Sequence, residues 1–516
     1  MFPYQKTDIL AIYRNLLEIA NNYSEKGYWK KSIDYLSSAA KWAYQFNYFY
    51  TDSVAESLLK RICNSTINPV EIKSPDNNKY VLLDSFCLDN RGLTQQYLRA
   101  MMHNKVEILY ICTSRSLENG EDILQELDNY PKARTLLFDK GKFGPIEIAK
   151  SIAEEMGHYS PAHLFLHVAP WDIVAMLSCC AMSGVVKYNI NLTDHAYWMG
   201  ASLIDYNIEF RPYGKTVSLE KRGLKPEQLL ELPFYPVDPI GHPFQGLPPM
   251  PDNAVKILTG GAMYKMLGKN DVFFSMMEQI LSIAPNVYIL VAGFYPNKFF
   301  SEKILKIKGH DRILVIGSRD DIDSVFQKCD IFLSTYPTSG GLMCQYAAKY
   351  GKPMLAYRDV DDVENAVEEM VNHFGGDFRS FVQMNDFVEY ARRLILDEKY
   401  RADEGASLAE NTMNANKFTQ SFAMMMSTRS TQLHWTLDHI DYDIFANRYL
   451  ELENANGFMA SRCLVLEGGF TMPFHLHGYK TQFLLCLIEM VKSSSILKRL
   501  KRTMHLNSNM RDEICN

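Results

Sequence analysis

The chain has 516 residues, of which 47% are hydrophobic and 22% charged, a balance typical of folded globular proteins and not of disordered ones. Its formal charge of −6 argues against a nucleic-acid-binding protein, which needs a basic surface. The ten cysteines are scattered, without a Cys-x-x-Cys pair or a zinc-site spacing, and therefore predict reduced thiols in a cytoplasmic protein.

Residues 1–75 are predicted to be helical. The sequence ILAIYRNLLEIANNYSEKGYWKKSIDYLSSAAKWAYQF, from Ile9 to Phe46, has apolar residues at helical spacing and a break at Lys26 and Gly27. This pattern indicates one or two helical hairpins similar to a tetratricopeptide unit, without a second copy at a fixed period. The N-terminus lacks the pattern of a signal peptide, and no stretch approaches 18 consecutive apolar residues, so we expect no membrane-spanning segment.

Between residues 76 and 232, short apolar runs alternate with longer amphipathic segments. Such alternation predicts a parallel sheet with helices on both faces, because strands covered on both sides are apolar along their whole length. The runs are YVLLDSF (80–86), VEILYIC (106–112), RTLLFD (134–139), HLFLHVA (163–169) and GVVKYNI (184–190).

A proline-rich segment follows at 233–253. Its core, PFYPVDPIGHPFQGLPPMP, holds seven of the 21 prolines and predicts a semi-rigid linker. The alternation then resumes over 254–395, and residues 396–516 are predicted to be helical. The expected fold class is therefore α/β, with two Rossmann-like doubly wound domains, N-terminal helical hairpins and a C-terminal helical extension. The apolar runs of the second domain are VKILTG (255–260), NVYILVAG (286–293), RILVIGS (312–318), DIFLST (330–335) and PMLAY (353–357).

Two glycine-rich turns of the second domain are candidate anion sites. The strand at 255–260 ends in Gly260 and Gly261, and Lys265 follows. The glycines would let a ligand approach the backbone, and the lysine would supply a positive charge to a phosphate. The alternative is an ordinary turn followed by a solvated lysine.

The second turn joins the strand at 330–335 to a helix. Unpaired helix amides, the helix dipole and two hydroxyl groups meet there, a combination that suits a diphosphate without a metal; a simple capping turn is the alternative. Because the carboxyl ends of parallel strands share one edge of a sheet, we expect both turns to face the same cleft. The residues of this turn are Thr338, Ser339, Gly340 and Gly341.

A family resemblance rests on these same residues. KILTGGAMYK, followed by CDIFLSTYPTSGGLMCQYAAKYGKPMLAY, resembles the donor half of a GT-B glycosyltransferase, most closely the O-linked N-acetylglucosamine transferase and SPINDLY group, with bacterial HMW-type protein glucosyltransferases as relatives. The resemblance covers about residues 80–400 and is stronger in the second domain. It implies that Lys265 and the turn at 338–341 contact the diphosphate of a nucleotide sugar, expected to be UDP-linked, with no cofactor.

The resemblance also marks further donor-side positions. GT-B enzymes commonly hold the nucleotide base at the end of the third donor strand, which points to Ser318 and Arg319; an N-cap with a solvated arginine is the alternative. Where the group has an acidic ribose ligand, this chain has Gln345 and Tyr346. Where the group has a histidine in its first acceptor loop, this chain has Asn90, Arg91 and Gly92.

Asp194 and His195 are the catalytic candidates of the first domain. They follow the apolar run at 184–190, so we expect them at a strand end facing the cleft. Histidine is the usual proton acceptor near neutral pH; a core histidine or a helix cap is the competing interpretation. The Asp-x-Asp pairs at 321–323 and 359–361 are more simply explained as helix starts, and no metal is expected.

These features predict a metal-independent glycosyltransferase. The donor would bind the domain at 254–395, and a saccharide or protein acceptor would bind the domain at 76–232, with retention or inversion left open. The alternative is a catalytically decayed GT-B protein that serves as a nucleotide- or protein-binding module. The segment TQFLLCLIEMVKSSSILKRLKRTMH (481–505) predicts a basic helix that either lies on the inner face of an anionic membrane or packs on the protein.

Overall fold

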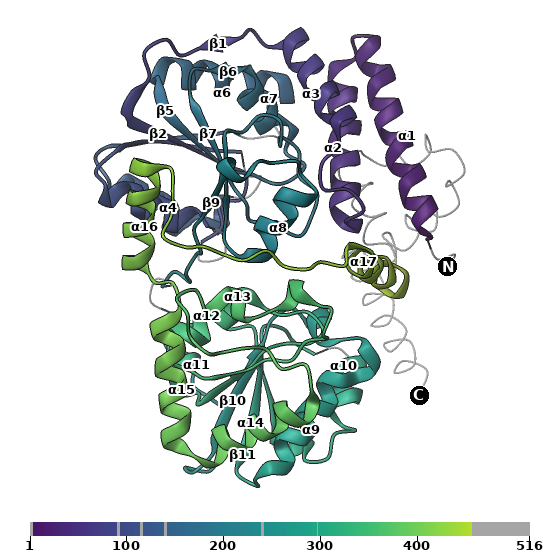
Figure 1. Cartoon of the computed structure of the whole chain (residues 1–516), viewed down its shortest axis with the longest axis vertical. Coiled ribbons are helices and arrows are strands. Elements are labelled where there is room, and N and C mark those ends of the chain that lie inside the picture. Colours follow the sequence, from purple (N-terminus) through teal and green to yellow (C-terminus); the bar gives the residue numbers. More distant parts are fainter. Residues whose placement is uncertain are drawn as a thin grey trace, which may run out of the picture.

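The computed structural model describes residues 4–89, 93–113, 117–138, 142–238, 242–296 and 298–456. Two α/β domains lie one above the other, and three N-terminal helices pack against one side of the first domain (Figure 1). Over these ranges, no helix combines the length and the apolar character that crossing a bilayer requires.

The N-terminal helices share one core with the first domain. α1 (Lys6–Glu25) and α2 (Trp29–Phe46) form a hairpin beside α3 (Ser53–Thr66). Their buried faces, with Leu16 and Leu36, belong to the same apolar cluster as Leu83 and Ile111 of the first sheet. The helical hairpin is therefore part of the first domain and not a separate module.

The first domain contains a seven-stranded parallel sheet in the order β4-β3-β2-β5-β7-β8-β9. The chain starts in the middle and moves first to one side and then to the other, so the strand order reverses between β2 and β5. The strands are β2 (Asp76–Asp84), β3 (Glu107–Cys112), β4 (Ala133–Leu137), β5 (Pro161–His167), β7 (Val186–Ile190), β8 (Tyr206–Glu209) and β9 (Leu229–Glu231), with a small separate pair of β1 (Val70–Glu71) and β6 (Met182–Ser183).

Helices cover both faces of this sheet (Figure 1). They are α4 (Thr94–His103), α5 (Glu121–Asp128), α6 (Pro145–Tyr159), α7 (Ile173–Ala181) and α8 (Pro212–Glu220). The described parts of the proline-rich segment, 233–238 and 242–253, form neither helix nor strand and lead to the second domain.

The second domain repeats the design with five parallel strands in the order β12-β11-β10-β13-β14. Its order reverses between β10 and β13, the strands that precede the two glycine-rich turns. Two doubly wound parallel sheets in one chain confirm the expected fold class. The strands are β10 (Val255–Gly260), β11 (Val287–Ala292), β12 (Ile313–Gly317), β13 (Ile331–Leu333) and β14 (Met354–Leu355).

The helices of the second domain follow its strands in the doubly wound pattern. They are α9 (Val272–Ile283), α10 (Lys298–Ile304), α11 (Ile322–Lys328), α12 (Gly341–Lys349), α13 (Glu368–Val371), α14 (Met384–Leu396) and α15 (Glu398–Asn411). Short 3-10 turns lie at Leu117–Asn119, Pro226–Gln228, Met263–Met266, Lys269–Asp271, His310–Arg312 and Val363–Asn365.

After α15 the chain returns to the first domain. α16 (Ala415–Thr428) packs on α4, with the Phe418 ring 5.3 Å from that of Tyr97. Residues 429–441, here called the strap, then cross the first domain in extended form to α17 (Tyr442–Asn456), which lies beside α2 at the domain boundary (Figure 1). The predicted basic helix at 481–505 lies outside the described residues.

Candidate functional site

A cavity of about 710 Å³ lies between the two domains, at the carboxyl edge of the second sheet. Ligands of open α/β sheets bind at this edge, next to the point where the strand order reverses. Residues 88–89 and 118–119 of the first domain close the opposite side. From the second domain the lining includes Gly261, Ala262, Gly293, Ser318, Arg319, Leu342, Met343 and Tyr346.

The start of α12 forms one wall of this cavity. Gly340 is the N-cap, and the first amide bonded within the helix is that of Cys344, which donates to the Gly340 carbonyl at 3.0 Å. In the described part of the chain, no acceptor takes the amides of Gly341, Leu342 or Met343. These amides and the helix dipole place partial positive charge beside the cavity, which suits an anion.

Lys265 joins the two predicted turns. Its Nζ donates to the Ser339 carbonyl at 2.9 Å, and the Thr338 amide donates to the Lys265 carbonyl at 3.4 Å. The two loops therefore meet on one side of the sheet, as the strand order requires. Burial lowers the pKa of Lys265. An ammonium has three N–H donors, so the bond to Ser339 leaves donors for a bound anion.

The two glycines after β10 have different roles. A Cβ at Gly260 would lie 2.9 Å from the Ala292 carbonyl oxygen, so this glycine lets β10 and β11 end close together. Gly261 has a φ of +142°, which only glycine adopts readily, and it lines the cavity. A Cβ added there would have the Lys265 side chain as its nearest neighbour, at 3.7 Å. Gly261 is therefore the glycine that a ligand can approach.

The turn at 338–341 is held in shape from several sides. The amide and hydroxyl of Ser339 donate to Asn365 Oδ1 at 2.8 and 3.1 Å, and Thr335 Oγ1 donates to the Thr338 carbonyl at 2.6 Å. The Tyr336 hydroxyl donates to Asp359 at 2.8 Å. Because the Ser339 hydroxyl is already bonded, the backbone amides that follow it are the groups presented to the cavity.

Arg319 and Gln345 lie near the cavity, but their side chains form hydrogen bonds to the linker. Arg319 donates to both oxygens of Asp321 at 2.6 and 2.5 Å and to the Gly246 carbonyl at 2.9 Å. The Gln345 side chain is buried, and its Nε2 donates to the carbonyls of Phe234 and Met370 at 3.0 and 3.3 Å. Gln345 does not line the cavity, and neither do Gly260, Lys265 or residues 338–341, so the donor contacts of all these residues stay predictions.

Asp194 forms a buried ion pair with Arg211, at 2.5 Å from Oδ2 to Nε and 3.0 Å from Oδ1 to Nη2. Burial alone would raise the pKa of Asp194, but the Arg211 guanidinium holds it below its ordinary value. Arg211 also donates to the Glu364 carbonyl at 2.6 Å and so connects the two domains. This geometry makes Asp194 part of the domain interface.

His195 lies in the loop between β7 and β8, beneath α17. Its Nδ1 is 3.6 Å from Asp194 Oδ1, and its ring is parallel to that of Tyr449 at 6.3 Å. The ring of Tyr44 lies 6.2 Å away on another side. His195 thus stands at the domain boundary, outside the lining of the 710 Å³ cavity.

A second cavity, of about 600 Å³, lies between α2 and the carboxyl edge of the first sheet. The Thr113 hydroxyl donates to Asp172 Oδ2 at 3.1 Å, and the Ser85 hydroxyl donates to the same oxygen. Residues 85–86 line this cavity and residues 88–89 line the other, so one loop separates them. Charged and aromatic groups share the remaining lining, among them Lys30, Asp34, Lys41, Phe86, Phe143 and Trp171.

Sequence reasoning missed the loop after β14. Asn365 reaches the turn at 338–341 from this loop through Ser339, and Arg448 of α17 contacts Asp362 and Glu364 of the same loop. The sequence could have pointed to this loop, because it follows the apolar run at 353–357. The carboxyl end of that strand lies at the same edge of the sheet as the two glycine-rich turns. No sequence pattern placed Arg448 there, since Arg448 lies 86 residues beyond Asp362.

Across the described ranges, no group of three or more His, Cys, Asp or Glu side chains is placed to hold a metal ion. Of the acidic residues considered in the sequence, Asp321 pairs with Arg319, and Asp359 pairs with Lys269 at 3.0 Å.

No protein-family model and no curated protein matches the sequence. Solved structures similar to the chain include an O-GlcNAc transferase mutant from Thermobaculum terrenum, with 13% identity, a TM-score of 0.49 and coverage of 85% of this chain and 84% of that one. HepE from Anabaena, in complex with UDP and glucose, has 12% identity and a TM-score of 0.48, with 68% of this chain and 99% of that chain covered.

A UDP-GlcNAc 2-epimerase from Neisseria meningitidis, bound to UDP-GlcNAc, has 12% identity and a TM-score of 0.48, with coverage of 68% and 100%. The similar structures thus include both transferases and epimerases. At such identities a shared activity does not follow from a shared architecture, and function has to be argued from the site itself.

Proposed function

We propose that this chain is a glycosyltransferase that moves a sugar from a nucleotide-diphosphate donor to a saccharide acceptor without a metal ion. One observation carries the proposal: the first three amides of α12, the open backbone at Gly261 and the ammonium of Lys265 meet beside one interdomain cavity. Fixed positive groups at this point would stabilise the charge that develops on a departing diphosphate.

The donor would occupy the 710 Å³ cavity, whose size suits a nucleotide sugar. The diphosphate would bind the start of α12, and the nucleoside would lie toward Ser318 at the end of β12. A UDP-linked hexose or N-acetylhexosamine is the donor we propose. Arg319 would support the nucleoside end indirectly, because its guanidinium fixes the linker at Gly246.

The acceptor would bind the first domain, and the 600 Å³ cavity is the place we propose for it. Its aromatic walls and hydrogen-bonding groups match the mixture that small-molecule pockets use. A saccharide acceptor fits a recess of this size, whereas a protein acceptor would have to insert an extended segment. His195 is the proposed proton acceptor, and closure of the domains about the linker would bring acceptor and donor together.

Titration of the whole chain with UDP and GDP, with and without EDTA, tests the proposal. We expect UDP to bind at least as tightly as GDP, with a dissociation constant that EDTA leaves unchanged, and we expect slow hydrolysis of one UDP-sugar in a panel followed by mass spectrometry. Nucleotide binding without turnover of any donor would support the non-catalytic alternative. Failure of both nucleotides to bind would refute the assignment.

A further inference from the structure

α17 places one arginine against the loop that holds the anion-binding turn. Arg448 meets Asp362 with both arms of its guanidinium, at 2.6 Å from Nη2 to Oδ2 and 3.0 Å from Nη1 to Oδ1. The two side chains are 11% and 4% exposed, so this pair is largely shielded from water. A two-point arginine–carboxylate contact fixes orientation as well as distance.

Asn365 carries this contact onward to the turn. Its Nδ2 donates to both oxygens of Asp362 at 3.1 Å, while its Oδ1 accepts the amide of Ser339 at 2.8 Å and the Ser339 hydroxyl at 3.1 Å. The carboxylate on one side and the two donors on the other allow only one orientation of this amide. Asp362 therefore determines where the acceptor for Ser339 lies.

We propose that Arg448 is a positioning residue for the donor site, an inference that rests on the proposed function. Arg448 fixes Asp362, Asp362 orients Asn365, and Asn365 holds Ser339 at the bend that aims the amides of Gly341–Met343 at the cavity. Arg448 also lies 3.5 Å from Glu364. Without the positive charge of Arg448, the carboxylates of Asp362 and Glu364 would lose their shared cation and repel a diphosphate at the neighbouring anion site.

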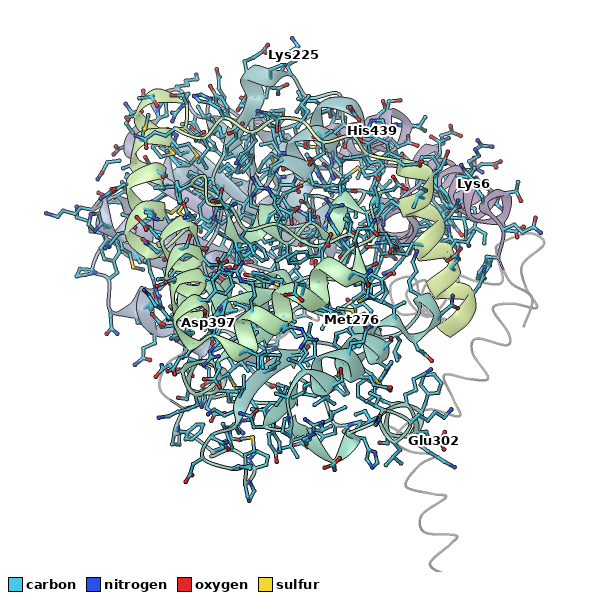
Figure 2. The ribbon with its side chains drawn as sticks, turned by 60° about the horizontal axis from the view of Figure 1, so that its bottom comes forward. Lys6, Lys225, Met276, Glu302, Asp397 and His439 are labelled. Atoms are coloured by element: carbon cyan, nitrogen blue, oxygen red, sulfur yellow. The ribbon has the colours of Figure 1, made fainter. Side chains whose placement is uncertain are left out.

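Two residues at the start of α17 bond to the N-terminal helices and the first domain. Asp443 pairs with Lys6 at 3.0 Å, and the Tyr442 hydroxyl donates to Glu220 at 2.6 Å. Figure 2, in which Lys6 and His439 are labelled, shows the strap leading to α17 beside the N-terminal helices. A change at Asp443 thus alters the docking of the same helix without touching the series from Arg448 to Ser339, and it provides a matched control.

The test compares Arg448→Met with Asp443→Asn in the full chain by two measurements. Hydrogen–deuterium exchange of a peptide covering 336–348 is measured without nucleotide, and UDP binding is measured by calorimetry. We expect faster exchange in Arg448→Met, because the Ser339 amide loses its fixed acceptor, and a UDP dissociation constant about tenfold higher, the equivalent of one hydrogen bond to the anion. Arg448→Lys should recover part of both effects, and Asp443→Asn should change neither.

Three further variants test the same connection at other residues, so the inference does not depend on Arg448→Met alone. Asn365→Ala should weaken UDP binding as much as Arg448→Met, and the double variant should be no weaker than either, because both remove the same connection. Additive losses would overturn the inference. If Arg448→Met does not fold, Asp362→Asn removes the same ion pair with little change in shape and is held to the same expectations.

The results also separate this inference from the proposed function. If wild-type protein binds UDP and Arg448→Met binds it equally well, the positioning role is overturned and the proposed function stands. Faster exchange with unchanged binding overturns the positioning role in the same way. If wild-type protein binds neither UDP nor GDP, the proposed function fails and the inference fails with it.

Discussion

Lys265 is the residue on which the donor site depends most directly. Its ammonium lies 2.9 Å from the Ser339 carbonyl, so it ties two loops together next to Gly261, which lines the cavity. The lysine stem is half-buried, and its environment differs from that of a surface lysine. Removing it takes away a cation while the amides of α12 remain in place.

We therefore expect Lys265→Ala to lower kcat/KM by about 100- to 1000-fold, the usual effect of losing one donor to a developing anion. UDP binding should weaken as well. Lys308→Ala is the control, because Lys308 is an exposed lysine of the same domain that precedes β12 and so stands at the opposite edge of the sheet. Kinetics unchanged from wild type in the Lys265 variant would remove this lysine from the mechanism.

Glu209 is a second residue with an unusual environment. It is fully buried on β8, where its oxygens accept from the Ser218 hydroxyl and Asn207 Nδ2, both at 2.5 Å, and from Asn191 Nδ2 at 2.8 Å. Burial, offset in part by Arg222, raises the pKa of Glu209 to about 7. The folded protein therefore holds a proton here at pH values where the unfolded chain has lost it.

This difference predicts that stability falls as the pH rises from about 4.5 toward 7, because over that range the folded state binds more protons than the unfolded state. The loss should approach about 3 kcal/mol. Glu209→Gln should remove this part of the pH dependence, and Asn191 Oδ1, which has no partner among the described residues, can accept from the new amide after rotation of the Asn191 side chain. Urea unfolding of both proteins at several pH values measures the effect, and parallel curves would contradict it.

At the residue scale, the sequence predicts which turns lie close together but not the direction in which each side chain points. The meeting of Lys265 with the turn at 338–341 follows from strand order, since both turns leave the same edge of one sheet. The inward position of Gln345 did not follow, because its helix presents residues to both the cavity and the linker, and a sequence does not say which face each one takes. His195 was expected at the cleft, and its role stays a prediction.

At the scale of elements, apolar runs identified five strands of the first sheet and missed β8 and β9. β8 was not predicted, because Asn207 and Glu209 break its apolar pattern. Both are nevertheless buried, because their polar groups are hydrogen-bonded. Asn189 Nδ2 donates to Asn207 Oδ1 at 2.7 Å, and Asn207 Nδ2 donates to Glu209. A buried polar network resembles a surface loop in sequence.

Helix docking is a second feature that periodicity does not reveal. α16 is amphipathic, and its apolar face packs on the first domain, although the helix follows the second domain in the chain. The Phe422 ring lies 5.8 Å from that of Phe165 and 5.9 Å from that of Tyr97, and the side chain is fully buried.

We expect Phe422→Ala to cost about 3–5 kcal/mol of unfolding free energy, the usual effect of truncating a buried aromatic residue. Because α16 leads into the strap, the variant should also be cut faster within 429–441 by a protease. Ser427→Ala, at an exposed position of the same helix, should leave both properties unchanged. Urea unfolding and limited proteolysis provide the measurements, and equal cleavage rates would show that α16 does not hold the strap.

At the scale of the whole molecule, two doubly wound domains were predictable because parallel strands buried on both faces stand out from the segments between them. The path of the chain after α15 was not, because it depends on which partner surface each later helix meets. The N-terminal helices likewise join the core of the first domain, although their spacing alone is compatible with an independent unit.

The return of α16 to the first domain has a consequence for biosynthesis. A ribosome completes the first sheet long before it makes Phe418 and Phe422, so the aromatic surface around Tyr97 remains bare while the entire second domain is being translated. The nascent protein thus has to keep this exposed apolar surface from aggregating until α16 emerges. Folding of the first domain finishes only when α16 has been made.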